Sequence, residues 1–159
     1  MIRTLVYATV FSLAVTASAP VVYGSPIIGI SKVPRIVSSV QFPQTRWGVV
    51  RHTIRLQIPK NSSTLSQLIV NVPPGLTMSN QITVSNQSGE KLGTNIAINE
   101  RKITISFLKY VAPGTNLNIA MKDIKIVGIS NAWLYPVSAR LIGINADLPI
   151  GIARFRIYR

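Results

Sequence analysis

Residues 102–126 read KITISFLKYVAPGTNLNIAMKDIKI, and this stretch decides the fold class. Apolar and polar residues alternate in it from Lys102 to Phe107 and again from Leu117 to Lys122. A period of two residues is typical of a β-strand that buries one face. Between the two runs, Ala112-Pro113-Gly114-Thr115 supplies the proline and glycine of a tight turn. We therefore predict two antiparallel strands joined as a hairpin.

A hairpin alone is marginal in water, so other strands must cover its apolar face. The same alternation recurs on both sides of it. Further strands are predicted at 54–58, 68–72, 82–84, 96–98, 133–142 and 153–157, with one short edge strand around 36–40. Residues such as Leu56, Ile105 and Phe155 would then face inward. About seven or eight short strands separated by turn signals predict an all-β fold, a single antiparallel β-sandwich.

The chain divides into three parts. Residues 1–24 combine a cationic start, an apolar run from Leu5 to Ala14 and small residues, which is typical of a signal peptide. We predict cleavage after Gly24, and a retained N-terminal membrane anchor is the alternative. Residues 25–50 contain Pro26, Pro34 and Pro43 without a sustained period, which predicts an extended arm. Residues 51–159 would form the sandwich domain.

The charge is strongly unbalanced, with 17 basic and 4 acidic side chains. Removal of residues 1–24 takes away only Arg3, so 16 basic residues face 4 acids, a net charge of +12. This excess predicts an anionic partner: an anionic envelope component, a membrane surface or an acidic protein. The alternative is that the charge only keeps the domain soluble. Nucleic acid is disfavoured by export and by the lack of a recognised module motif.

The side chains that could carry out catalysis are few. The chain has no cysteine, one histidine and four acids, and the acids are each at least ten residues apart and near turns or strand ends. His52 has no motif partner for a metal site, and no nucleophile motif accompanies a triad with Asp123 or Asp147. We predict a solvated edge-strand histidine, no enzyme activity, no cofactor and no metal.

The best candidate for a binding surface is cationic. Arg154, Arg156 and Tyr158 fall on one strand face, and Arg140 lies on the polar face of a strand that we expect nearby. Guanidinium groups in a row suit phosphate, sulfate or carboxylate oxygens, and a tyrosine ring can stack on a ligand ring. The alternative is that these are ordinary solvent-facing strand positions. Lys102, Lys122 and Arg55 also point to polar faces, but their sheet is undetermined.

The two tryptophans are predicted to differ. Trp133 opens a strand beside Leu134 and Tyr135, which favours packing in the core over an exposed platform for a ligand. Trp47 follows Arg46 in the arm, and both interpretations stay open for it.

Three segments together resemble a family of small exported domains of unknown function, best known from cyanobacteria. They are Ile54 to Pro59, Val111-Ala112-Pro113-Gly114-Thr115 and the ending Pro149 to Tyr158, within a region of about residues 50–158. The resemblance implies an immunoglobulin-like sandwich outside the cytoplasm, in the periplasm, the thylakoid lumen or the extracellular space. It implies no catalytic residue.

These observations lead to two hypotheses of function. In the first, an exported non-enzymatic domain binds an anionic envelope or membrane-associated partner through its basic surface. In the second, the chain is a structural or accessory subunit of a surface fibre or of a photosynthetic membrane complex. There the segment from Ser25 to Trp47 would dock on a neighbour by strand addition. The partner and the oligomeric state are not determined by the sequence.

Overall fold

The computed structural model describes residues 32–158, which form ten β-strands and contain no helix. The signal peptide predicted for residues 1–24 lies outside the described residues. The strands are β1 Arg35–Phe42, β2 Gly48–Gln57, β3 Leu65–Asn71, β4 Leu76–Thr77, β5 Ile82–Asn86, β6 Thr94–Asn99, β7 Lys102–Val111, β8 Asn116–Ile126, β9 Ala132–Leu141 and β10 Leu148–Arg156. Two more strands are present than the highest number predicted, because β1 is a full strand and β4 adds a two-residue one.

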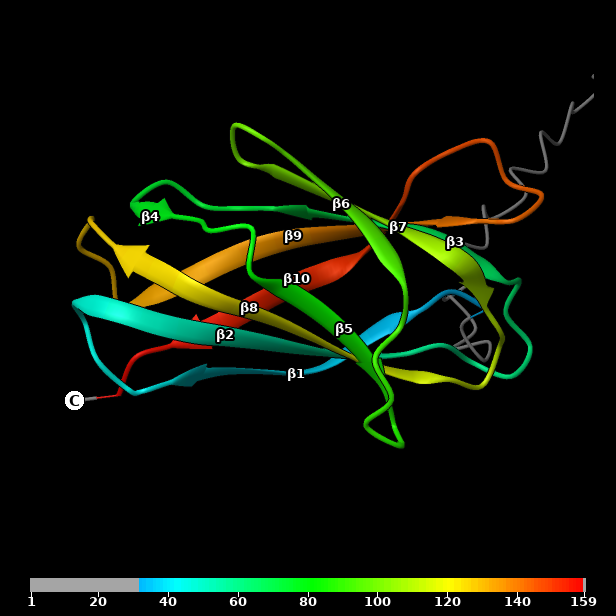
Figure 1. Cartoon of the computed structure of the whole chain (residues 1–159), viewed down its shortest axis with the longest axis horizontal. Coiled ribbons are helices and arrows are strands. Elements are labelled where there is room, and N and C mark those ends of the chain that lie inside the picture. The colour runs from blue at the N-terminus through cyan, green and yellow to red at the C-terminus, as the bar shows by residue number, and fades with distance from the viewer. Residues whose placement is uncertain (1–31, 159) are drawn as a thin grey trace, which may run out of the picture.

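The strands form two antiparallel sheets that pack face to face, as Figure 1 shows. One sheet has the order β1-β2-β8, with β4 and β5 both paired to the far edge of β8. The other has the order β10-β9-β3-β7-β6. Leu56, Ile105 and Phe155 lie in the core between them, each at most 1% exposed. The predicted all-β sandwich is confirmed.

The hairpin predicted for residues 102–126 is wrong in its pairing. β7 pairs with β3 and β6, whereas β8 pairs with β2, β4 and β5 in the opposite sheet. The turn at 112–115 carries the chain across the sandwich. It is held by Ile58, the residue that follows β2, because Gly114 N donates to Ile58 O and Ile58 N donates to Thr115 O, each at 2.9 Å. The apolar faces of β7 and β8 therefore meet across the core instead of lying side by side.

A true hairpin precedes this crossover and has no glycine in its turn. Asn99 of β6 lies opposite Lys102 of β7, so Glu100 and Arg101 alone make the reversal. Glu100 adopts a φ of 54°, a left-handed conformation that costs a non-glycine residue some energy. The turn with the weaker sequence signal is thus the one that joins paired strands.

A β-bulge in β8 keeps its apolar residues inward. Met121 and Ile124 are both buried although they are three positions apart, which breaks the period of two. The register shifts here, since Val50 lies opposite Ile124 while His52 lies opposite Met121. The extra residue is accommodated with Asp123 at a φ of 52°. Ile124 therefore faces inward and Asp123 outward.

The segment predicted to be an extended arm is largely part of the sandwich. β1 is an eight-residue strand paired with β2 along most of its length, and β2 begins at Gly48, before the predicted domain start at residue 51. β1 forms the edge of its sheet. This part of the segment is therefore not a free arm, because β1 already pairs with β2 in its own domain.

Candidate functional site

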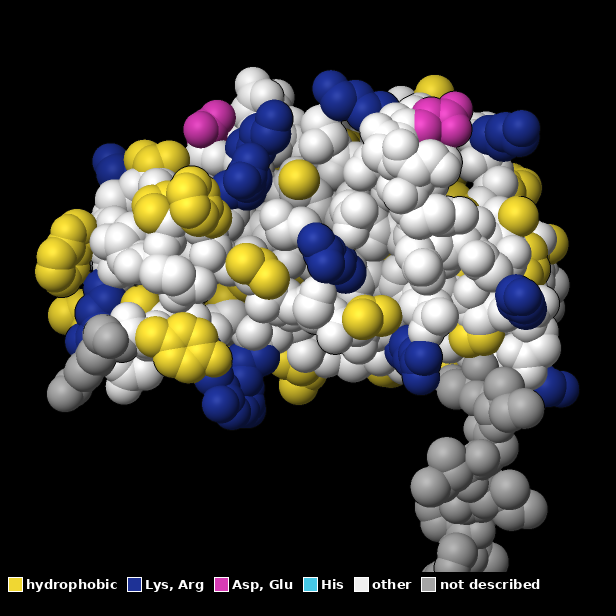
Figure 2. All heavy atoms as spheres, turned by 90° about the horizontal axis from the view of Figure 1, so that it is seen from below, with side chains coloured by type: hydrophobic (Ala, Val, Ile, Leu, Met, Phe, Trp, Pro, Cys, Tyr) yellow, Lys and Arg dark blue, Asp and Glu magenta, His cyan; other side chains and the backbone are white. Residues whose placement is uncertain are grey.

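The described surface is rich in unpaired positive charge. Within residues 32–158 the single ion pair joins Arg140 to Asp147, and the other lysines and arginines lie beyond 4 Å from any of the four acids. Figure 2 shows Lys and Arg side chains spread along one face of the molecule, with acids at only two places. A surface of this kind attracts anions over long distances at low ionic strength.

Arg154, Arg156 and Tyr158 project from β10 and the residues after it, as predicted. They are exposed, whereas the alternating Ala153, Phe155 and Ile157 are buried. Successive outward side chains on a strand lie about 7 Å apart, so the two guanidinium groups form a short cationic row. Each group has its fork free to receive an oxyanion.

Arg140 does not join this row, so that part of the predicted surface is wrong. Arg154 lies opposite Leu134 on β9, and Arg140 follows Leu134 by six residues, which is about 20 Å along the strand. Its guanidinium is also engaged: Nε donates to Asp147 Oδ1 at 2.9 Å, and Nη2 lies 2.8 Å from the same oxygen. Arg140 on β9 and Arg154 on β10 are in adjacent strands but lie near opposite ends of the strand pair.

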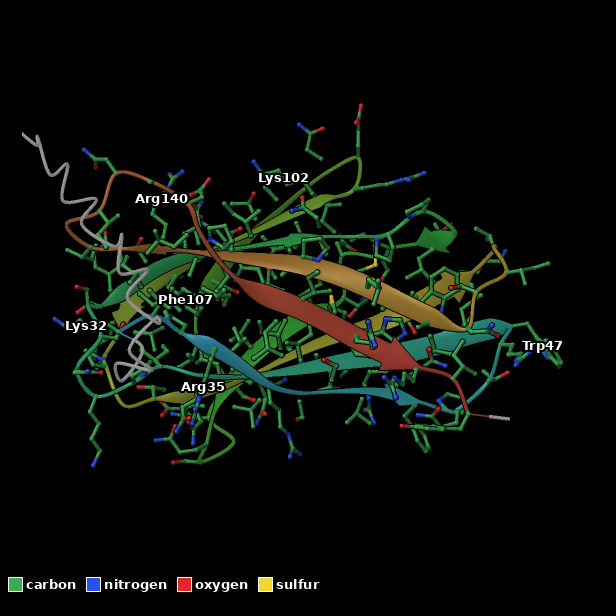
Figure 3. All side chains as sticks on the ribbon, turned by 180° about the vertical axis from the view of Figure 1, so that it is seen from behind. Lys32, Arg35, Trp47, Lys102, Phe107 and Arg140 are labelled. Carbon is green, nitrogen blue, oxygen red and sulfur yellow. The ribbon has the colours of Figure 1, made fainter. Side chains whose placement is uncertain are left out.

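The outer edges of β1 and β10 enclose a groove beside the cationic row. Both strands end their sheets and run side by side, as Figure 3 shows, and a Cβ at Gly151 would come within 3.3 Å of Ile36 Cδ1. The groove has a volume of about 460 Å³. It is lined by Ser39, Val40, Gln41 and Gln44 from the β1 side and by Arg154, Arg156 and Tyr158 from the β10 side. The β1 residues were missed from the sequence because they face β10 only through the tertiary arrangement.

Beneath the groove lies a buried chain of hydrogen bonds. His52 Nδ1 lies 2.6 Å from the Tyr135 hydroxyl, and His52 Nε2 lies 2.9 Å from Gln41 Oε1. Gln41 Nε2 donates to the carbonyl oxygens of Pro43 at 3.1 Å and Thr45 at 2.8 Å. With a neutral histidine, the Tyr135 hydroxyl donates to His52 Nδ1 and His52 Nε2–H donates to Gln41 Oε1. Each of these three side chains then has its hydrogen-bonding groups paired within this network or to the backbone.

His52 is not the solvated edge histidine that was predicted. It is 0% exposed, since β1 covers the outer side of β2 and the ring stacks on Phe155 at a centroid distance of 4.2 Å. Burial lowers its pKa from 6.5 to about 3, which keeps the ring neutral, and burial also raises the pKa of Tyr135. The sequence did hold the signal, because Val50, His52 and Ile54 alternate on one inward face.

The groups that could support catalysis lie apart. His52 has no exposed surface from which to reach a substrate, and Asp123 and Asp147 are on the outside of the sandwich. In the part of the chain from 32 to 158, no three His, Asp or Glu residues come together as a metal site.

The remaining predicted residues separate between the two sheets. Lys102, Arg140, Arg154 and Arg156 lie on one sheet, and Arg55 and Lys122 lie on the other. Trp133 is 3% exposed, which confirms its predicted place in the core, and Trp47 is 75% exposed.

The structure is similar to domains of bacterial surface proteins. It matches the N-terminal domain of a Streptococcus gordonii adhesin with a TM-score of 0.52 and 14% identity, covering 79% of this chain. It matches BcpA, the major pilin subunit of Bacillus cereus, with a TM-score of 0.52 and 10% identity over 77% of this chain. It also matches the pilus backbone protein RrgB of Streptococcus pneumoniae, with a TM-score of 0.50 and 10% identity over 67%. The similarity is one of fold.

This chain spans only part of those proteins: 32% of the adhesin chain, 40% of BcpA and 31% of RrgB. No protein-family model matches the sequence, and no curated protein sequence matches it either. The resemblance to exported cyanobacterial domains stays a prediction. In residues 32–158 there is no helix long and apolar enough to cross a membrane.

Proposed function

We propose that this chain is a non-enzymatic domain of a cell-surface structure and that it attaches to an anionic partner through its cationic surface. The observation that carries the proposal is the row of Arg154 and Arg156 beside the β1–β10 groove, where neither guanidinium has an acid within 4 Å. Guanidinium groups held about 7 Å apart on a rigid strand can bind successive oxyanions of a headgroup layer or a polymer.

Two observations support a role without catalysis. The only histidine is sealed in the core by Gln41, Tyr135 and Phe155, and it serves there as a hydrogen-bonding link. Glu90, Glu100 and Asp147 lie in three separate turns and loops, and Asp123 lies in the bulge of β8, so the four acids come from four different places in the fold. We therefore expect this domain to act on another molecule by binding it through its charged surface.

The similarity to an adhesin domain and to two pilins supports a place in a surface fibre or an adhesive protein, and therefore export. This chain matches only one part of each of those longer proteins, which agrees with a domain that serves as one module of a larger structure. Attachment to a neighbour would not donate residues 35–42 as a free arm, because β1 pairs with β2.

Salt-dependent binding tests the anionic partner. The chain should bind dextran sulfate and anionic lipid vesicles, and the affinity should fall steeply as the salt concentration rises, because exposed charges are screened beyond about 10 Å at 0.1 M. Arg154→Gln with Arg156→Gln should weaken binding by about tenfold, at ~1 kcal/mol or less per exposed charge. The matched control is Lys60→Gln with Lys91→Gln, which removes the same charge at exposed positions away from the groove.

Equal losses in both double variants would mean that binding follows net charge and not the groove. Absence of binding to every polyanion would refute the anionic partner. A separate experiment tests whether the chain belongs to a cell-surface fibre: chemical cross-linking in the native envelope, followed by mass spectrometry. A ladder of high-mass products is expected. A monomeric product alone would contradict a place in such a fibre.

A further inference from the structure

Exposed apolar side chains gather at one end of the sandwich. Gly48 lies opposite Ile126, so Trp47 and Val127 extend from adjacent strand ends, and Ile157 N donates to Asn131 O, which brings Tyr158 beside them. Figure 3 shows Trp47 at the tip, at the opposite end of the molecule from Lys32. We call this the aromatic end; its members are Phe42, Trp47, Val49, Val127, Ile129 and Tyr158, all more than half exposed.

Trp47, Val127 and Ile129 lie in loops that hydrogen bonds hold in place. The loop after β8 is fixed because Val127 N and Gly128 N both donate to Gly75 O at 2.9 Å. Gly128 and Gly75 also touch, since a Cβ at Gly128 would lie 2.8 Å from Gly75 Cα. Ile129, which follows Gly128, is therefore fully exposed on a loop that does not fold back to cover it.

The loop that carries Trp47 is held from the core. Gln41, which is 2% exposed, donates its amide protons to the carbonyls of Pro43 and Thr45, and Thr45 Oγ1 donates to Trp47 O at 3.0 Å. Keeping several large apolar side chains fixed in water is unfavourable for a soluble domain, and fixed exposed apolar groups are typical of interaction sites. The buried hydrogen-bond chain thus also positions an exposed indole.

Positive charge surrounds the aromatic end. The Arg51 guanidinium lies 5.8 Å from the centroid of the Phe42 ring, and Phe42, Arg51 and Lys122 line one shallow hollow. Lys125 lies opposite Val49, and Arg46 precedes Trp47. Asp123 is the acid that lies among these cations. At the left-hand end of Figure 2, dark blue side chains alternate with yellow ones.

We propose that the aromatic end docks on the surface of an anionic lipid membrane, with Trp47 and Ile129 inserted among the headgroups. This inference rests on the proposed function and specifies its anionic partner. The apolar side chains come from three separate segments and project individually, so a rigid protein partner would need several separate pockets, whereas a bilayer interface accepts them all at once. Aromatic rings favour the headgroup level, and each nearby lysine or arginine adds to the attraction toward an anionic leaflet.

Trp47 itself reports the docking. Because Trp133 is 3% exposed and Trp47 is 75% exposed, solvent-sensitive indole emission comes from Trp47. The full chain is mixed with vesicles of phosphatidylglycerol and phosphatidylcholine, or of phosphatidylcholine alone. With the anionic vesicles we expect the emission to shift to shorter wavelength and brominated lipids to quench it. Phosphatidylcholine alone should give a weaker response.

Variants separate the aromatic end from the rest of the chain. Trp47→Ser with Ile129→Ser should weaken vesicle binding by about tenfold or more, since roughly 1.4 kcal/mol of lost apolar transfer is a factor of ten. The control is Leu108→Ser with Tyr110→Ser on β7, which are 68% and 57% exposed and lie away from this end; binding should not change. The apolar segment near the N-terminus is the same in all variants.

Vesicle binding that leaves Trp47 unquenched, or an equal loss in the control, would overturn the inference. A shift of Trp47 emission that depends on protein concentration without lipid would overturn it too, because the end would then bind protein. If dextran sulfate binds but vesicles do not, the inference fails while the proposed function stands. If neither binds, both fail.

Discussion

The interior of this sandwich has an apolar centre and one polar corner, and they are stabilised in different ways. In the centre, residues such as Ile54, Leu68 and Ile105 are completely buried among other apolar side chains, where burial stabilises without fixed directions. In the corner, Gln41, His52 and Tyr135 form a hydrogen-bonded chain against Phe155. Such a chain stabilises only when every member is present.

The difference shows what holds β1 in place. Of the eight residues of β1, Gln41 alone is buried, so the strand contributes little apolar surface to the centre. Its side chain instead connects β1 to His52 on β2 and, through His52, to Tyr135 on β9 in the other sheet. The polar corner therefore secures an edge strand and the Trp47 loop that the apolar centre does not reach.

The largest effect is expected when His52, the central member of the hydrogen-bonded chain, is replaced. His52→Leu leaves the Tyr135 hydroxyl and Gln41 Oε1 buried without partners, at ~1–3 kcal/mol each, so the free energy of unfolding should fall by about 3 to 5 kcal/mol. Urea denaturation measures it. The control is Ile54→Leu on the same strand and inward face, which conserves volume and should cost less than about 1.5 kcal/mol. Equal losses of unfolding free energy in the two variants would mean that the hydrogen bonds of the polar corner add nothing beyond ordinary apolar packing.

Acid should weaken the corner selectively. The pKa of His52 is about 3 in the folded chain and 6.5 when exposed, so the unfolded chain binds the extra proton between these values. The contribution of His52 is complete above pH 6.5 and is lost as the pH falls toward 3. At 1.36 kcal/mol per pH unit, roughly 3 kcal/mol should disappear between pH 6.5 and pH 4.

His52→Gln supplies the control for this prediction, because a glutamine can hydrogen-bond but does not titrate in this range. Its unfolding free energy should depend less on pH over the same interval, as measured by urea denaturation at each pH. Parallel pH profiles for the two proteins would show that His52 is not the group that titrates.

Replacement of Gln41, which lies at one end of the hydrogen-bonded chain, should lower the free energy of unfolding by a smaller amount. Gln41→Leu leaves His52 Nε2–H without an acceptor, so we expect a loss of about 2 kcal/mol, whereas Val40→Thr at the half-exposed neighbouring position should change stability by less than about 0.5 kcal/mol. In a double-mutant cycle, Gln41→Leu and His52→Leu together should cost less than the sum of their separate effects. Simple additivity would argue against a connected chain.

The smallest effect is expected outside the core. Arg140 and Asp147 form an ion pair whose side chains are 48% and 35% exposed, so solvent screens it. Arg140→Ala should lower the unfolding free energy by less than about 1 kcal/mol, and high salt should remove most of the difference. A loss comparable with that of Gln41→Leu would place this pair among the main stabilising contacts.

Strand positions and inward faces were predictable because alternation is a local property. Ala153, Phe155 and Ile157 were predicted to face inward and do so, and the same rule places His52 beside Val50 and Ile54. His52 was predicted to be exposed because polar side chains usually are, and its burial depends on Gln41 and Tyr135, which are 11 and 83 residues away. A single-strand pattern does not reveal partners at that distance.

The amino-acid sequence by itself determined the fold class, the alternation of buried and exposed residues and the cationic surface, since each follows from residue type and neighbouring positions. The tertiary structure alone decided that the 112–115 turn crosses between sheets, that Arg140 lies away from Arg154, and that Trp47 and Ile129 share one end. The physical reason is that strand pairing joins residues far apart in the chain, so the companions of a side chain depend on the whole sheet order.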